Sequence, residues 1–156
     1  STGVFAYVIP FSVLPGQTQV SIDFDWAFDG TDTSTALANV DNFIAGVAGD
    51  GFSMSNPMAV FTPLVSRSSP GGFSSGHFSQ TFAASSLPVP VPATGLRYLV
   101  FALSEGTSLT APNGTNSAIG IDNILVAAVP EPETYAFMLA GLGLVGLVAK
   151  RRGLRA

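Results

Sequence analysis

Apolar and polar residues alternate strictly from Gln19 to Asp29, which is the clearest pattern along the chain. Every second residue is Val, Ile, Phe or Trp, and the residues between them are small, polar or acidic. Alternation with period two over this length is typical of a strand with one face in a core. The acids Asp23, Asp25 and Asp29 therefore share the opposite row. Trp26 lies in the apolar phase, and we expect it in the core.

Shorter apolar runs predict the remaining strands. Val4 to Leu14 contains Pro10 and is typical of an edge or bent strand, whereas the almost wholly apolar run from Arg97 to Leu103 indicates a central strand. The other strand candidates are 40–47, 58–65, 78–82 and 118–129.

The segments between these runs read as connections. The Ser- and Gly-rich stretch from Ser66 to Ser79 predicts a long loop or hairpin, and the alternating prolines of 87–94 predict an extended connector. Asp122-Asn123 interrupts the apolar pattern of the last strand and predicts a bulge or a hydrogen-bonded turn. Short strands with turns between them and no helical period predict an all-β, antiparallel β-sandwich over 1–128.

The C-terminal part changes character. Residues 129–134 hold two prolines and predict a stiff, extended boundary. The fifteen residues 135–149 carry no charge, and 150–156 are strongly basic. Fifteen residues fall short of the ~20 of a comfortable membrane span, and a buried core helix is the alternative. Apolar residues on every face, three glycines and a basic end that can snorkel favour a single transmembrane helix over 135–149.

Charge and composition exclude several functions. The net charge is −4, but up to residue 129 there are eight acids and only two bases. A body this acidic offers no basic stripe for phosphates, so we expect no nucleic-acid partner. The chain has no cysteine, which excludes disulfides and thiolate chemistry. It begins at Ser1 without a cationic leader, and we interpret this N-terminus as processed or truncated.

A Pro-Glu-Pro motif, a short apolar segment and a basic cluster follow one another over roughly the last 28 residues. The motif with its flanking residues is Val129, Pro130, Glu131, Pro132 and Glu133. The basic cluster is Lys150, Arg151 and Arg152. This order resembles the PEP-CTERM sorting signal of exported proteins in Gram-negative bacteria that make extracellular polysaccharide.

The resemblance implies a partner and a location. It implies recognition through Pro130, Glu131 and Pro132 by an exosortase, a membrane cysteine transpeptidase that removes the helix. The precursor is then expected in the inner membrane, with lipid around 135–149, residues 150–156 in the cytoplasm and the sandwich in the periplasm. After processing, the body is expected at the cell surface or outside the cell.

The body resembles a second family more distantly. Phe24-Asp25-Trp26, Val40-Asp41-Asn42-Phe43 and the segment 120–126 are similar to jelly-roll domains of the carbohydrate-binding-module type. This resemblance implies a jelly-roll-like sandwich. Because jelly rolls serve many functions, it does not by itself imply sugar binding.

The acidic residues suggest one cofactor. Carboxylate oxygens suit Ca²⁺, which takes six to eight oxygen ligands. The candidate ligands are Asp25, Asp29, Asp32 and Asp122, with Asp41 as a further candidate. The alternative is a solvated strand face whose charges discourage edge pairing.

Candidate catalytic groups are scarce. Gly72 to Gly76 matches the G-x-S-x-G elbow, but the elbow needs a strand before it, a helix after it and a histidine later in the chain. The only histidine, His77, follows directly, so we expect a flexible loop with a solvated His77. No carboxylate is set apart as the raised-pKa acid of a glycosidase.

These observations favour a non-enzymatic surface or extracellular-matrix protein. A carbohydrate-binding module acting on the extracellular polysaccharide is the first alternative, and it requires a concave face lined with exposed aromatics. A cryptic hydrolase is the second, and it requires convergent polar groups in a pocket. The sequence does not separate the matrix protein from the binding module.

Overall fold

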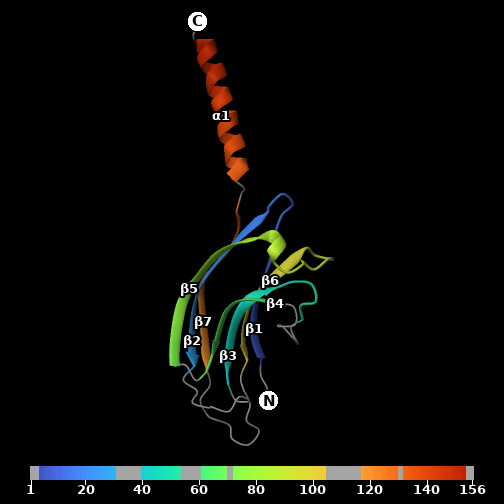
Figure 1. Ribbon diagram of the computed structural model, residues 1–156, viewed down its shortest axis with the longest axis vertical. Coiled ribbons are helices and arrows are strands. Elements are labelled where there is room, and N and C mark those ends of the chain that lie inside the picture. The colour runs from blue at the N-terminus through green and yellow to red at the C-terminus, as the bar shows by residue number, and fades with distance from the viewer. Residues whose placement is uncertain are drawn as a thin grey trace, which may run out of the picture.

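The computed structural model describes residues 4–30, 40–53, 61–69, 72–104, 117–129 and 132–153. The strands are β1 (Val4–Ser12), β2 (Gln19–Gly30), β3 (Asn42–Ala48), β4 (Phe61–Ser68), β5 (Gly72–Ala83), β6 (Leu96–Ser104) and β7 (Ala118–Val129). A short 3-10 helix, η2 (Ala84–Ser86), follows β5, and one α-helix, α1 (Pro132–Gly153), ends the described chain. Figure 1 shows the strands in two stacked layers, with α1 extending away from them.

Every described strand pairing is antiparallel. The four-stranded sheet has the order β1-β6-β3-β4, and the three-stranded sheet has the order β5-β2-β7. Side chains on the inner faces of the two sheets form the core. The predicted antiparallel β-sandwich is therefore confirmed, while its jelly-roll connectivity stays a prediction.

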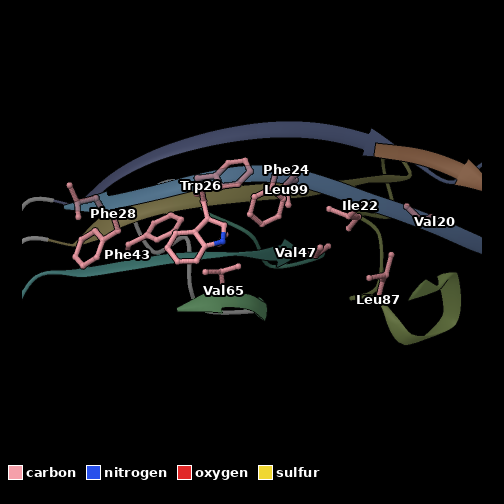
Figure 2. Close-up of a cluster of buried hydrophobic side chains, with 13 residues drawn as sticks. Val20, Ile22, Phe24, Trp26, Phe28, Phe43, Val47, Val65, Leu87 and Leu99 are labelled. Atoms are coloured by element: carbon pink, nitrogen blue, oxygen red, sulfur yellow. The ribbon is translucent and has the colours of Figure 1, made fainter. Parts of the chain in front are cut away.

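The core is built around β2, as its alternating pattern predicts. Phe24 meets Phe101 edge to face with 5.0 Å between ring centroids. The ring centroids of Trp26 and Phe28 both lie about 6 Å from that of Phe43, and Figure 2 shows these three side chains together. Trp26 is only 7% exposed, which confirms it as a core residue. Burying a side chain as large as Phe contributes about 1.5–3 kcal/mol each, so this aromatic row holds the two sheets together.

The positions of β6 and β1 confirm two further predictions. β6 lies between β1 and β3, and its outward-facing Val100 and Ala102 are buried as well as its inward-facing residues. The stacked rings of Phe52 and Tyr98, with centroids 4.7 Å apart, pack against this outer layer. β1 is an edge strand and contains Pro10, whose missing N–H an edge position tolerates.

The segment from Ser66 to Ser79 is neither the predicted long loop nor the predicted hairpin, since β4 and β5 belong to different sheets. β4 continues to Ser68 and β5 begins at Gly72, so most of the segment is a pair of strand ends around a short connection. β5 pairs with β2 along its whole length, and none of its side chains is buried. Because the side chains on both faces of this edge strand are exposed or half-buried, the strand needs no apolar alternation. The sequence pattern therefore does not reveal it. Of the predicted strand 58–65, residues 58–60 lie outside the described residues.

The predicted extended connector 87–94 ends in a turn at 92–94, where the N–H groups of Thr94 and Gly95 donate to the Val91 carbonyl at 3.1 and 2.7 Å. Polar contacts hold the connector in place. Arg97 is 8% exposed and donates from Nε to the Pro88 carbonyl at 2.7 Å and from Nη2 to the Ala84 carbonyl at 3.3 Å. Burial lowers the pKa of the Arg97 guanidinium from its ordinary value. Leu87, at the start of the connector, is buried in the core. The connector is therefore fixed to the end of the sandwich.

Candidate functional site

The C-terminal helix α1 begins at Pro132, three residues before the predicted start. Proline is tolerated in the first helical turn, where its missing N–H has no partner in any case. Glu133 lies in the same turn, where the helix dipole favours a negative charge. Val129 ends β7, and Pro130 and Glu131 lie outside the described residues. Of the extended boundary predicted for 129–134, Val129 therefore belongs to β7 and residues 132–134 belong to α1.

The described side chains of α1 are all exposed, although most are apolar. Phe137 is 77% exposed, and Leu139, Leu142, Leu144 and Leu147 are each more than 60% exposed. A Cβ built on any of the three helix glycines would meet nothing within 4 Å. Lys150 is exposed near the end of α1, and Arg151 and Arg152 lie in its last turn. A helix that is apolar on all sides is suited to an apolar environment or to a partner rather than to water.

The predicted transmembrane helix over 135–149 is not confirmed. Among the described residues, no helix combines the length and apolar character needed to cross a membrane. Fifteen residues at 1.5 Å per residue cover about 22 Å, which is less than the ~30 Å of a hydrocarbon core.

A polar cluster lies on the outer face of the three-stranded sheet. Asp25 on β2 lies opposite His77 on β5, and its Oδ1 is 2.7 Å from His77 Nδ1. Asn123 on β7 donates from Nδ2 to the other carboxylate oxygen, Oδ2, at 2.6 Å. The three strands of this sheet are thus joined across their outer face by one carboxylate. From the sequence, we expect His77 as a solvated loop residue. It is exposed, but it lies on β5, in register with Asp25.

A bulge in β7 positions the Asn123 side chain. The β2–β7 register shifts between Asp23 and Asp25, so that Asp25 lies opposite Asp122, and Asn123 adopts φ of 50°. Asn is one of the few residues that tolerate this left-handed conformation. The Asn123 backbone N–H is held by Asp122 Oδ1 at 2.7 Å. The predicted bulge at Asp122-Asn123 is confirmed.

The neighbours of Asp25 in this cluster affect its pKa. The hydrogen bond from Asn123, followed by that with His77, lowers the pKa of Asp25 from its ordinary value. Asp23 Oδ1 lies 4.0 Å from His77 Nε2, so the imidazole lies between two carboxylates. The side chains of His77 and Asp25 are 60% and 42% exposed. This water-exposed carboxylate–imidazole contact links neighbouring strands of the sheet.

Of the predicted calcium ligands, the described residues bring together only Asp25 and Asp122, which lie opposite one another on β2 and β7. Asp25 and Asp122 line a shallow depression of about 330 Å³ on the β2–β7 face. Both oxygens of Asp25 already accept hydrogen bonds, and Asp29 lies farther along β2, paired with Phe73 and Ala118. Asp32 lies outside the described residues. The described chain contains no group of three or more His, Cys, Asp or Glu side chains that could hold a metal ion.

Asp41, the further calcium candidate, has a buried side chain and links three segments of the chain. Asp41 is 3% exposed, and its backbone N–H donates to Ser69 Oγ at 2.9 Å. The Ser69 N–H returns a bond of 2.9 Å to the Asp41 carbonyl, and the Ser117 N–H donates to Asp41 Oδ2 at 3.3 Å. Asp41 therefore ties the start of β3 to the β4–β5 turn and to the start of β7. The hydroxyl of Ser117 is buried there and has no hydrogen-bond partner among the described residues.

A polar groove of about 400 Å³ lies between β4 and β5. Trp26 lies at its base, and the Arg67 guanidinium covers the indole at 4.6 Å from the ring centroid. Ser66, Ser75 and His77 complete the polar part of its lining. A cation over an aromatic face contributes about 0.5–1 kcal/mol at an exposed site. The groove thus presents a guanidinium and hydroxyls, while the indole itself is nearly covered.

The G-x-S-x-G match at Gly72 to Gly76 lies inside β5, with no strand-to-helix turn. Ser74 lies on the inward-facing side of the strand, as do Gly76 against Trp26 and Phe78 against Phe24. His77 lies on the opposite side with Asp25. Successive strand residues point to opposite faces, so Ser74 and His77 cannot form a nucleophile–base pair.

Residues 128–152 match the family of the PEP-CTERM protein-sorting motif. The match spans the end of β7, the Pro-Glu-Pro residues and nearly all of α1, including the basic cluster. No curated protein matches the chain significantly. Comparison with solved structures likewise finds no significant match. The C-terminal segment therefore carries a sorting signal of the kind that exosortases process, while the sandwich has no matched relative.

Proposed function

We propose that this chain is an exported, non-enzymatic surface or extracellular-matrix protein whose α1 segment holds the precursor at the membrane until an exosortase removes it. The observation that carries the proposal is the coincidence of the sorting-motif match at 128–152 with a helix whose described side chains are all exposed. The jelly-roll-like sandwich is the cargo in this proposal. Its role after processing is adhesion, glycan contact or structure in the matrix.

The chemistry of α1 supports its role as a temporary anchor. Burial of apolar surface is favourable by about 25 cal/mol per Å², and α1 presents Tyr135 and a continuous apolar surface up to Lys150. Tyr135 stands where an interfacial aromatic is favoured, and the basic end stands where lysine and arginine snorkel to headgroups. We propose that these flanking residues compensate for the short apolar segment, with local bilayer thinning accommodating the remainder.

The arrangement of the sandwich supports a role other than catalysis. Its closest carboxylate–imidazole pair, Asp25 and His77, is open to water, and Asp25 also accepts a hydrogen bond from Asn123. The buried carboxylate of Asp41 bonds backbone groups at the junction of three segments. Both arrangements fix strands in place, and neither one sets an acid, a base and a nucleophile together as catalysis requires.

Glycan contact is a second candidate, favoured by the groove between β4 and β5. Arg67 and the hydroxyls of Ser66 and Ser75 can donate hydrogen bonds to sugar oxygens or to a uronate carboxylate. The described exposed aromatics of the sandwich, Phe5, Tyr7 and Phe73, lie on edge strands of different sheets and not on one concave face. Affinity electrophoresis in gels containing acidic polysaccharide tests this role. Retardation that is lost in Arg67→Ala supports it, and equal mobility with and without polysaccharide contradicts it.

The sorting proposal is tested by expressing the full chain in a host that has an exosortase. Pro132→Ala alters the motif, while Pro92→Ala makes the same change at an exposed position of the connector. We expect wild type and Pro92→Ala to reach the surface or the medium, and Pro132→Ala to stay in the membrane fraction as the full-length chain. Equal export of all three proteins, with α1 retained, contradicts recognition of the motif. A wild-type chain recovered wholly in the soluble cell fraction contradicts the anchoring role.

A further inference from the structure

We propose that the free edge of β5 is a self-association interface, at which a second copy of this chain pairs antiparallel with it and joins the two three-stranded sheets into one. This inference concerns the sandwich and stands independently of the sorting tail. It follows from a comparison of the four strands that end the two sheets. These edge strands are β1, β4, β5 and β7.

β5 presents a long and regular edge. Its twelve residues pair in unbroken register with β2, from Gly72 opposite Gly30 to Ala83 opposite Gln19. No described strand pairs with its other side. In Figure 1, β5 forms the left margin of the sandwich, with no described element beyond it. Its outward N–H and C=O groups are therefore available to another strand.

The other three edges each carry a feature that blocks strand addition. β1 contains Pro10, and β4 contains Pro63 together with a shift in its register with β3. β7 is interrupted by the bulge at Asp122 and the left-handed Asn123. Prolines and bulges are the devices by which proteins protect sheet edges from pairing. β5 contains neither a proline nor a bulge, so its edge can pair with a strand of a partner.

The charges of β5 identify the partner as a second copy. The sandwich is acidic overall, yet β5 contains no Asp, Glu, Lys, Arg or Pro. Two copies therefore repel along most surfaces but can approach along this strand. The only titratable side chain of β5 is His77, which contacts Asp25 and Asp23 of its own sheet. Antiparallel self-pairing therefore sets a strand of mainly Ser, Thr, Gln, Gly and Phe against its copy, with no carboxylate, lysine or arginine of β5 facing its like. It also covers Phe73, which is 69% exposed, and shields the half-buried Phe78 and Phe82.

Sedimentation velocity of the full chain in a non-ionic detergent tests the interface. Ser75→Lys/Thr81→Lys places two lysines at exposed positions of β5, and Ser12→Lys/Ala118→Lys places two at exposed positions of β1 and β7 as a matched control. We expect wild type and the control to sediment as dimers, and the β5 variant as a monomer. A monomeric wild type, or a β5 variant that remains as dimeric as the control, overturns the proposal. Association through α1 is common to all three proteins and would produce the second of these results.

A second measurement leaves the edge uncharged, in case the lysine variant fails to fold. The chain has no cysteine, so one introduced thiol takes a spin label at a single position. Dipolar electron resonance on full-length Ser79→Cys should give a short distance between the labels of two copies. Ser12→Cys on β1 should give a much longer one. Equal distances for both, or a shorter one at Ser12, overturn the β5 interface.

Discussion

Asp25 and Asn123, 98 residues apart in the chain, are joined by a 2.6 Å hydrogen bond across the bulge between β2 and β7. The bond exists because the bulge turns Asn123 into a left-handed conformation that directs its amide at the carboxylate. It is the largest cause of the lowered pKa of Asp25. This relationship makes Asp25 a local reporter of whether β7 is correctly docked on β2.

Replacing Asn123 with glycine should raise the pKa of Asp25 toward its ordinary value of 3.8. Glycine keeps the positive φ without strain and removes only the amide. The carboxyl carbon shift of Asp25, followed by NMR between about pH 2 and pH 6, measures the change. An unchanged titration of Asp25 in Asn123→Gly would show that the amide does not hold the carboxylate in solution.

The contribution of Asp25 to the free energy of unfolding should decrease as the pH falls. A carboxyl whose pKa is lowered by folding stabilises the fold above its unfolded pKa, and this contribution is lost as pH falls through the lower folded value. We therefore expect Asp25→Asn to be less stable than wild type near neutral pH, with the difference shrinking below about pH 3.8. Urea denaturation at a series of pH values tests this. A difference that grows toward acid pH contradicts the assigned sign.

Two glycines on the described strands and turns should differ sharply in their tolerance of alanine. A Cβ at Gly49 would collide with the Val89 carbonyl oxygen and lie 2.9 Å from Pro88 Cβ, against a connector fixed by Arg97. At Gly120 the nearest atom would be Ala27 Cβ at 3.8 Å. Gly49→Ala should cost about 2 kcal/mol, and Gly120→Ala less than about 0.5 kcal/mol. Denaturation midpoints measure both, and equal midpoints would contradict the close packing at Gly49.

Two substitutions at the Asp41 junction should have different effects on the free energy of unfolding. Asp41→Ala removes a buried acceptor of the Ser117 N–H and should cost about 2–3 kcal/mol. Ser117→Ala removes a buried hydroxyl that has no partner among the described residues, so it should be neutral or stabilise by up to about 1 kcal/mol. Calorimetry of both variants decides the matter. A large loss in Ser117→Ala would mean that its hydroxyl has a partner in solution.

The sequence predicts those parts of the fold in which one face is buried. The alternation around Phe24 and Trp26 identifies β2, and the apolar run after Arg97 identifies β6, because these strands have core-facing or doubly buried positions. β5 is missed because its side chains are exposed or half-buried, so burial imposes no pattern on Ser and Gly. The start of α1 is missed because proline, a helix breaker in the interior, is compatible with a first turn.

The candidate sites are less predictable because they depend on register. Nothing local to His77 indicates that Asp25 lies opposite it, 52 residues away in sequence. The break in pattern at Asp122-Asn123 does indicate a bulge, and an Asn at such a break is a signal for a left-handed residue. The sorting motif is recognisable because it is a contiguous segment that requires no tertiary contact.

The most direct test of the central claim is the intact mass of the mature protein from an exosortase-containing host, beside the same chain from a host without the enzyme. The account predicts a product that retains the sandwich and lacks α1 only where the enzyme is present, and the full-length mass where it is absent. A full-length chain in both hosts would contradict processing at the motif and leave α1 as a permanent part of the protein.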